Sequence, residues 1–320
     1  MDIIDVFNGD ADGICALLQL RKADPQKSQL ITGVKRDIQL LARVDAGQGD
    51  RVTVLDISME KNTADLNRLL DQGVDVFYAD HHRPGVIPDH SGLTAIIDTD
   101  SETCTSLLID KYLGGRFQPW AITAAFGDNM NRAAEFLCKK QNYSSKQVDQ
   151  LRSLGVCLNY NGYGEGIEDL HIAPDKLYLS LLAYRDPMDV ITDASSCYQQ
   201  LYSGYHEDLG LAGKVGAAFS SDSVEIIILP SEPWARRVSG VFGNQLTNTN
   251  PEKAHAVMTP NSKGGYVVSV RAPLTNRRGA DQLCSQFPSG GGRQAAAGIN
   301  HLPVADFDKF AAAMQKMYMK

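Results

Sequence analysis

Paired carboxylates follow the first predicted strand of this chain, in a segment whose residue types suit a divalent cation. The strand is Ile3–Phe7, a short apolar run rich in β-branched residues, and the segment is N-G-D-A-D-G, with Asp10 and Asp12 two residues apart. Two carboxylates at this spacing in a turn can converge on one cation, and the flanking glycines let the backbone bend tightly. Aspartates in glycine-rich loops are also common as plain turn residues, because their side chains bond local backbone. The segment by itself leaves both interpretations open.

Two well-known loop types do not match this segment. An EF-hand places Glu at its twelfth position, where this chain has Gln19, and it follows a helix rather than a strand. A dinucleotide-binding fingerprint is absent, because no G-x-G-x-x-G follows the first strand.

Two more predicted strands end on residues of the same kind. Arg51–Asp56 ends on Asp56, and Val74–Asp80 ends on Asp80, which is followed by His81 and His82. A single strand-terminal Asp is usually a cap, but a parallel sheet presents its ligand sites at the carboxyl ends of its strands. Carboxylates gathered there repel one another unless metal ions are present. A site of oxygen ligands with one or two imidazoles suits Mn²⁺ or a similar divalent ion, whereas a structural zinc site would be rich in thiolates.

Two further segments carry weaker signals. Asp128, in G-D-N, follows an apolar run, and a helix-terminal Asp is the plain interpretation. Near the end of the chain, S-G-G-G-R-Q-A-A-A-G exposes backbone N–H groups that can cradle an anion, and Arg293 adds a bidentate donor. No G-K-[ST] follows, so this is not a P-loop. A flexible linker is the alternative, although A-A-A-G suggests close packing. Arg271 ends the preceding predicted strand, and Arg277 and Arg278 follow it.

The elements that position these residues alternate between strands and helices, which predicts an α/β fold with a parallel sheet. Helices are expected at Ile14–Lys22 and Asn62–Gln72, and a fourth strand at Leu93–Asp98. Residues 120–184 look mostly helical, interrupted by a Gly-rich loop at Asn159–Gly166. The later elements expected are Val224–Leu229, Ala254–Met258 and Gly265–Arg271 as strands, Pro233–Leu246, Ala280–Phe287 and Val304–Met317 as helices, and a Gly-rich loop before the last helix. We predict domains at 1–190 and 223–320, joined by a connector at 191–222.

Composition limits the class of protein. The 320 residues are 43% apolar and 22% charged, which excludes wholesale disorder and favours two globular domains. The net charge is −7, divided into −11 for residues 1–220 and +4 for residues 221–320. The acidic total argues against a nucleic-acid coat protein or a membrane-surface binder. Six scattered cysteines without C-x-x-C, no signal-peptide pattern and no apolar run of about 20 residues predict a cytoplasmic protein that does not span a membrane.

The segments N-G-D-A-D-G, V-L-D, D-H-H, G-D-N and G-G-G-R-Q-A-A-A-G follow one another in the order known from DHH phosphoesterases that carry a DHHA1 domain. Over about residues 1–300 the chain resembles this family. The resemblance implies a parallel-sheet DHH catalytic domain, a helical connector and a smaller α/β DHHA1 domain, with the active site in the cleft between them. It implies two divalent ions, Mn²⁺ first and Mg²⁺ or Co²⁺ as alternatives, held by Asp10, Asp12, Asp56, His81 and Asp128.

The resemblance also assigns further roles. Asp56 would bridge the ions, His82 would face the substrate phosphate, and Asp80 would orient the imidazoles, so that Asp56, Asp80, His81 and His82 are the expected catalytic residues. The expected substrate contacts are Asn8, Arg271, Gly290, Gly291, Gly292 and Arg293.

Two positions depart from the family. Val6 stands where several relatives have His, which leaves one metal with fewer ligands, and Arg293 replaces the usual His of G-G-G-H. Arginine favours a phosphate or a guanine edge.

The expected function is metal-dependent hydrolysis of very short oligonucleotides, above all linear dinucleotides, to mononucleotides. Long nucleic acids are not expected as partners, because the chain lacks a long basic track. A RecJ-like single-strand exonuclease, a phosphatase acting on pAp or another small phosphate, and a catalytically decayed nucleotide-binding regulator are the alternatives. The sequence leaves a monomer and a homodimer equally open.

Overall fold

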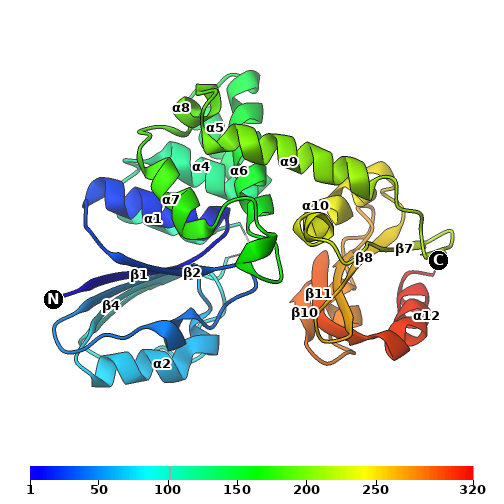
Figure 1. Cartoon of the computed structure of the whole chain (residues 1–320), viewed down its shortest axis with the longest axis horizontal. Helices are drawn as coiled ribbons and strands as arrows, with labels where there is room; N and C mark the ends of the chain where they lie inside the picture. The colour runs from blue at the N-terminus through cyan, green and yellow to red at the C-terminus, as the bar shows by residue number, and fades with distance from the viewer. Residues whose placement is uncertain (101, 320) are drawn as a thin grey trace. The chain divides into compact units, whose positions relative to one another are not determined.

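A computed structural model describes residues 1–100 and 102–319, which form two compact units, Met1–Gly204 and Tyr205–Lys320. Each unit is built on its own β-sheet (Figure 1). The division falls inside α9 (Cys197–Ala212), within the predicted connector. We predicted only weak helices in this connector, but α9 is a continuous helix of 16 residues.

The first unit contains the predicted parallel sheet, with one strand that the sequence analysis did not identify. Its order is β2-β1-β3-β4-β5, and every neighbouring pair is parallel. The strands are β1 (Ile3–Asn8), β2 (Gln29–Gly33), β3 (Arg51–Leu55), β4 (Asp75–Asp80) and β5 (Leu93–Ile97). The missed strand, β2, lies at the edge beside β1, and its residues are only partly buried, so it lacks a strong apolar pattern.

Helices cover both faces of this sheet. In Figure 1, α2 lies on one face, while α1, α4, α6 and α7 lie on the other. Val6 of β1 packs with Leu66 and Leu69 of α2 in a buried apolar cluster. The helices are α1 (Ala11–Ala23), α2 (Met59–Asp71), α3 (Thr105–Tyr112), α4 (Gln118–Gly127), α5 (Asn131–Lys140), α6 (Ser145–Asn161), α7 (Pro174–Leu182) and α8 (Pro187–Thr192). This arrangement leaves the carboxyl ends of β1, β3 and β4 at one edge of the sheet.

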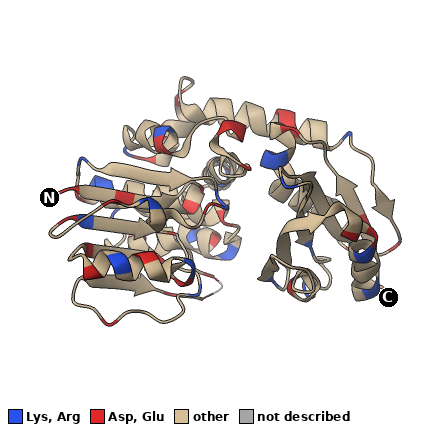
Figure 2. Ribbon diagram, turned by 60° about the horizontal axis from the view of Figure 1, so that its bottom comes forward, with Lys and Arg blue, Asp and Glu red and all other residues tan. Residues whose placement is uncertain are grey.

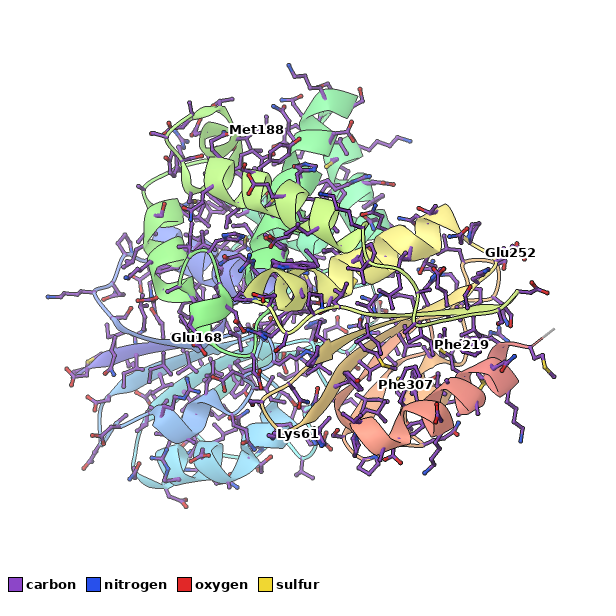
Figure 3. The ribbon with its side chains drawn as sticks, turned by 45° about the vertical axis from the view of Figure 1, so that its right-hand side comes forward. Lys61, Glu168, Met188, Phe219, Glu252 and Phe307 are labelled. Atoms are coloured by element: carbon purple, nitrogen blue, oxygen red, sulfur yellow. The ribbon has the colours of Figure 1, made fainter. Side chains whose placement is uncertain are left out.

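The second unit is a smaller α/β fold with a mixed sheet in the order β10-β11-β9-β8-β7-β6. Only β7 and β8 are parallel neighbours. Its strands and helices are β6 (Phe219–Ser220), β7 (Val224–Ile228), α10 (Pro233–Thr249), β8 (Ala254–Pro260), β9 (Gly265–Arg271), α11 (Ala280–Cys284), β10 (Gly290–Arg293), β11 (Ala296–Pro303) and α12 (Phe307–Tyr318). Phe219 and Phe307, labelled in Figure 3, pack against the apolar core of this unit.

The expected Gly-rich loop near the end of the chain is a strand, and that expectation is wrong. Gly290–Arg293 pairs in antiparallel register with β11 as strand β10. A Cβ on Gly292 would lie 2.4 Å from the Cα of Ala297, so the close approach of the two strands requires glycine. Residues of the A-A-A-G segment pair with β10 in β11, which agrees with the close packing that its small side chains suggested.

Charged residues lie on the elements of both units (Figure 2). In the part of the chain that the structure describes, no helix is both long and apolar enough to cross a membrane.

A buried ion pair ties β1 to α1 and gives a stability prediction. The guanidinium of Arg21 donates to Asp5, with Nε 2.8 Å from Oδ2, and Ser28 Oγ donates to the same carboxylate at 2.6 Å. Asp5 is fully buried and Arg21 nearly so. Arg21→Met leaves the carboxylate without its cation and should lower the free energy of unfolding by about 3–5 kcal/mol in urea denaturation.

The double variant Asp5→Leu/Arg21→Met is the control for this pair. Because it removes both charges, it should be more stable than Arg21→Met alone. An unchanged urea midpoint for Arg21→Met would show that the pair does not stabilise the fold.

Candidate metal centre

Asp10 both caps α1 and faces the site. Its Oδ1 accepts from the backbone N–H groups of Asp12 at 3.0 Å and Gly13 at 3.1 Å, at the N-terminus of α1. Gly13 packs against β1 so closely that a Cβ would lie 2.3 Å from the carbonyl oxygen of Asn8. The G-D-A-D-G spacing therefore serves a tight strand-to-helix turn and presents Asp10 at the end of β1.

Asp12 joins this turn to the N-terminus of α3. Its Oδ2 accepts from the N–H of Thr105 at 2.8 Å, and its Oδ1 accepts from the N–H of Ser106 at 2.7 Å. Ser106 Oγ donates back to the Asp12 carbonyl at 2.8 Å. The first N–H groups of a helix have no partner within it, so they fix this buried carboxylate in place.

Asp56 follows β3 in a left-handed backbone conformation, with φ of 58°. Such a conformation is uncommon outside glycine, and strain of this kind gathers at functional sites. The N–H of Asp56 donates to the Ala79 carbonyl at 3.1 Å, and Thr105 Oγ1 donates to its Oδ1 at 3.3 Å. These contacts hold the carboxylate toward the other strand ends.

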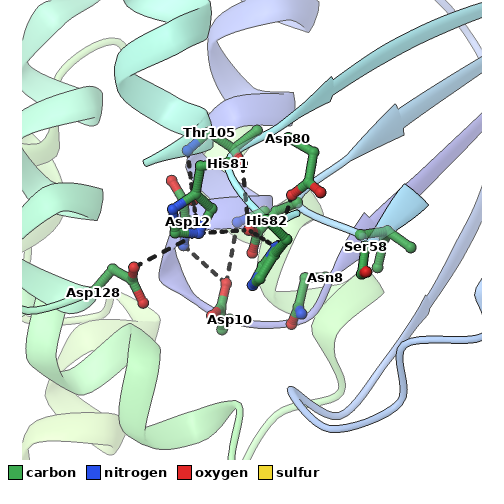
Figure 4. Close-up of polar contacts among 12 residues, drawn as sticks. Asn8, Asp10, Asp12, Ser58, Asp80, His81, His82, Thr105 and Asp128 are labelled. Carbon is green, nitrogen blue, oxygen red and sulfur yellow. Dashed lines mark hydrogen bonds and ion pairs between the residues drawn. The ribbon is translucent and has the colours of Figure 1, made fainter. Parts of the chain in front are cut away.

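His81 faces three of the carboxylates through one nitrogen (Figure 4). Its Nδ1 lies 3.1 Å from the carbonyl oxygen of Thr103, which can only accept, so Nδ1 carries a proton and Nε2 is the nitrogen that has the lone pair in the neutral ring. The distances from Nε2 are 3.5 Å to Asp56 Oδ1 and 3.9 Å to Asp12 Oδ2 and to Asp128 Oδ2. This is the tautomer that a metal-binding histidine needs.

His82 points its other nitrogen away from Asp80. Its Nδ1 donates to Asp80 Oδ1 at 2.7 Å, and it lies 3.9 Å from Asp56 Oδ1. Burial lowers the pKa of His82, but the hydrogen bond and charge of Asp80 outweigh burial and raise it. Asp80 thus orients His82, whereas a backbone carbonyl orients His81.

Lys35, which no sequence motif singled out, lies inside the cluster. Lys35 follows β2, and its Nζ contacts Asp10 Oδ2, Asp128 Oδ1 at 3.3 Å and Asn159 Oδ1 at 2.9 Å. Burial lowers the pKa of Lys35, but the charge of Asp10 outweighs it and raises the pKa well above its usual value. The signal that could have found Lys35 is the short run L-I-T before G-V-K, read as a strand beside β1.

Asn8 lies beside the cluster with one unused oxygen. Its Nδ2 donates to the Lys35 carbonyl at 3.2 Å, and its buried Oδ1 has no hydrogen-bond partner among the residues described. Val6, the position where several relatives have His, has its side chain in the apolar cluster against α2. Neither Asn8 nor Val6 supplies the imidazole ligand that several relatives have at the position of Val6.

The electrostatics of the cluster fit a divalent cation. Burial and the charges of Asp10 and Asp12 raise the pKa of Asp56 well above its usual value. By contrast, the pKa of Asp10 is lowered, because the charge and hydrogen bond of Lys35 outweigh burial. Asp56, His81 and His82 each offer a ligand atom within 4.8 Å of the others. Hard carboxylate oxygens with an imidazole nitrogen are the donor set for Mn²⁺ or a similar ion.

The candidate substrate residues of the second unit differ in how they are held. Arg271 donates from Nε to Asn244 Oδ1 at 2.6 Å and from its terminal nitrogens to Ser269, Val270 and Gly240. Its guanidinium is therefore fixed against α10. Arg293 is exposed at the end of β10, next to Gly291 and Gly292, which are also exposed.

Comparison with known proteins identifies the fold. No protein-family model matches the sequence, and no curated protein matches it. Among solved structures, RecJ of Thermus thermophilus in complex with Mn²⁺ superposes with a TM-score of 0.61 at 18% identity, over 98% of this chain and 51% of that chain. The chain thus spans about half the length of that protein.

Two other structures resemble the chain over most of their own length. A manganese-bound exonuclease RecJ has a TM-score of 0.57 at 16% identity, covering 98% of this chain and 89% of that chain. The pGpG-specific phosphodiesterase PggH of Vibrio cholerae has a TM-score of 0.55 at 14% identity, covering 99% and 98%. The predicted α/β fold, with a parallel-sheet unit and a smaller α/β unit, is confirmed as the fold that the chain shares with RecJ and PggH.

Proposed function

We propose that this chain, which has the two-domain fold of RecJ and PggH, is a divalent-metal-dependent phosphodiesterase that hydrolyses very short oligonucleotides, above all linear dinucleotides, to mononucleotides. The observation that carries the proposal is the placement of His81 Nε2 within 3.5–3.9 Å of the carboxylates of Asp12, Asp56 and Asp128. Mn²⁺ is the proposed ion, and Mg²⁺ and Co²⁺ are the alternatives. A bound ion of this kind acidifies water and stabilises the charge that develops on a phosphate.

The chain's own residues prepare this chemistry. Asp12, Asp56, Asp128 and His81 would hold an ion, and the Thr103 carbonyl keeps the His81 lone pair on Nε2. Asp80 accepts the Nδ1 proton of His82, so that Nε2 of His82 is the nitrogen left to donate to a phosphate oxygen when the ring is charged. His82 is about half exposed, with 45% of its side-chain surface accessible, which lets a substrate reach it.

The proposed substrate length rests on PggH, which is named for its action on pGpG and of which this chain covers 98%. This chain also covers 89% of a manganese-bound RecJ, so chain length does not separate the two activities, and the lack of a long basic track favours the short substrate. We propose that Arg293 and the backbone of Gly290–Gly292 bind the nucleotide distal to the scissile bond, with Arg271 and Asn8 as further contacts. We keep the cytoplasmic location from the sequence analysis as a prediction.

The substrate class is tested with the full chain and Mn²⁺ against GpG, ApA and pAp. The proposal expects hydrolysis of the dinucleotides to mononucleotides and little phosphate release from pAp. Faster turnover of pAp than of any dinucleotide would instead make the protein a small-phosphate phosphatase. Equal turnover of GpG and ApA would remove the guanine preference that Arg293 suggests.

Arg293→Ala should weaken substrate binding more than it slows the chemical step. Loss of one charged hydrogen-bonding partner costs about 1.5–3 kcal/mol, so KM should rise roughly 10-fold or more while kcat changes little. Steady-state kinetics with GpG measure the two constants. Arg277→Ala, which removes another exposed arginine of the second unit, is the control and should leave both constants unchanged. A fall in kcat at constant KM would contradict a binding role.

A further inference from the structure

The oxygens of Asp10 are already occupied by partners within the chain. Oδ1 accepts from two backbone N–H groups at the start of α1, and Oδ2 pairs with the ammonium of Lys35. Asp10 is 2% exposed. Because two N–H donors fill Oδ1, a metal ion on this carboxylate would bind Oδ2 next to the Lys35 ammonium, where the two positive charges repel each other.

Oxygen atoms surround the Lys35 ammonium much as ligands surround a bound metal ion. An ammonium has three N–H donors, and three oxygens from Asp10, Asp128 and Asn159 lie around Nζ. These acceptors come from the β1–α1 turn, the end of α4 and the last turns of α6, so parts of the chain far apart in sequence converge on one positive charge. The Tyr163 ring adds a further contact, 5.7 Å from Nζ to the ring centroid.

In the other half of the cluster, Asp12 accepts two backbone N–H groups, but among the residues described no lysine or arginine pairs with Asp12 or Asp56. Asp56 accepts a long hydroxyl hydrogen bond of 3.3 Å from Thr105, and the lone pair of His81 Nε2 faces it. Asp128 stands between the halves, with Oδ1 3.3 Å from Lys35 Nζ and Oδ2 3.9 Å from His81 Nε2. The cluster thus has one half that holds a lysine and one half that presents ligands.

We propose that the ammonium of Lys35 takes the place of one of the two expected divalent ions, so that the chain binds a single ion beside Asp12, Asp56, Asp128 and His81. Asp10 is then the partner of Lys35 rather than a metal ligand. This inference deepens the proposed function and rests on it for the role of the remaining ion. Charge supports it, because one divalent ion and one ammonium bring +3 against the four carboxylates, whereas two ions and the ammonium would bring +5.

The side chain at Val6 also argues against a divalent ion on the Asp10 side of the cluster, where Lys35 lies. A second ion on the Asp10 side would need ligands from β1, but Val6 is fully buried among apolar side chains. The Asn8 amide oxygen and the Asp10 carboxylate would be its nearest ligands on that strand end. Removing the lysine frees the oxygens of Asp10, Asp128 and Asn159 that now surround its ammonium, and with the Asn8 amide oxygen they should hold a second ion that the native chain does not bind.

Metal counting on the full chain tests the proposal without any substrate. The wild-type protein, Lys35→Ala and Lys27→Ala are saturated with Mn²⁺, freed of excess ion, analysed for Mn²⁺ per chain and examined by electron paramagnetic resonance. We expect one magnetically isolated Mn²⁺ per wild-type chain and two magnetically coupled ions per Lys35→Ala chain. Lys27→Ala removes an exposed positive charge from the same unit and should keep one ion.

Two results would overturn the proposal. One is a pair of coupled Mn²⁺ ions in the wild-type chain, which would mean that Lys35 leaves when metal binds. The other is a single ion in a Lys35→Ala protein that is folded by circular dichroism. If Lys35→Ala does not fold, the wild-type count alone decides. Because the count uses no substrate, lack of dinucleotide hydrolysis would contradict the proposed function and leave this inference standing.

Discussion

Asp56→Asn is expected to abolish turnover while leaving the metal-free protein at least as stable as the wild type. Asp56 lies 3.5 Å from His81 Nε2 and is the carboxylate whose pKa burial and its neighbours raise most clearly in the cluster. Without it the ion loses a central ligand, and the loss of several kcal/mol of charge stabilisation corresponds to roughly a thousandfold in kcat/KM. The stability change has the opposite sign, because a neutral amide removes a buried charge that its neighbours oppose.

The stability effect of Asp56 also has a predictable pH dependence. A carboxyl whose pKa is raised in the folded state binds its proton more tightly there than in the unfolded chain. Its contribution to stability is therefore present at low pH and is lost as pH rises from the unfolded value through the raised folded one. Above that window, metal-free Asp56→Asn should match or exceed the wild-type melting temperature.

Kinetics with GpG and thermal melts in EDTA measure the two effects of this substitution. Asp71→Asn, at the exposed end of α2, is the matched control and should change neither. Near-normal Mn²⁺-dependent activity of Asp56→Asn would contradict the assignment of Asp56 as a metal ligand.

Removing divalent ions from the wild-type chain is expected to abolish activity and to lower its melting temperature. An ion that binds only the folded state stabilises it by about 2.7 kcal/mol at a concentration 100 times its Kd. For a unit of this size, this corresponds to a shift of roughly 5–10 °C. Adding Mn²⁺ back should restore both activity and stability.

The same titration on Asp56→Asn locates the stabilising ion. If the ion binds at the cluster, Mn²⁺ should raise the melting temperature of this variant much less than that of the wild type. An equal rise in the two proteins would place the stabilising ion elsewhere in the chain.

The sequence was sufficient to predict the elements that bear strong patterns. The apolar runs before Asp10, Asp56 and Asp80 form β1, β3 and β4, and because parallel strands end at one edge, the structure brings the residues after them together. The edge strand β2 was missed because its Q-L-I-T-G is short and partly exposed. Lys35 was missed with it, since a lysine after an unrecognised strand has no reason to be placed in the site.

Other parts of the site depend on contacts that no local pattern contains. The proton position on His81 depends on the backbone carbonyl of Thr103, and Asp12 is fixed by the N-terminus of α3, more than 90 residues further along the chain. The G-G-G-R segment was misread as a loop because three glycines usually weaken a strand. Here the close packing of β10 on β11 requires glycine at Gly292, and Gly290 lies against the Cys284 carbonyl, whereas Gly291 has open space around it.

The length dependence of hydrolysis tests the proposed function most directly. With Mn²⁺ present, kcat/KM is measured on single-stranded RNA of increasing length, beginning with a dinucleotide, and the products are separated by chromatography. Specificity for very short substrates predicts that the dinucleotide is cleaved most efficiently, to mononucleotides, and that kcat/KM falls steeply as nucleotides are added. Equal or rising kcat/KM with length would contradict this function and favour a RecJ-like exonuclease.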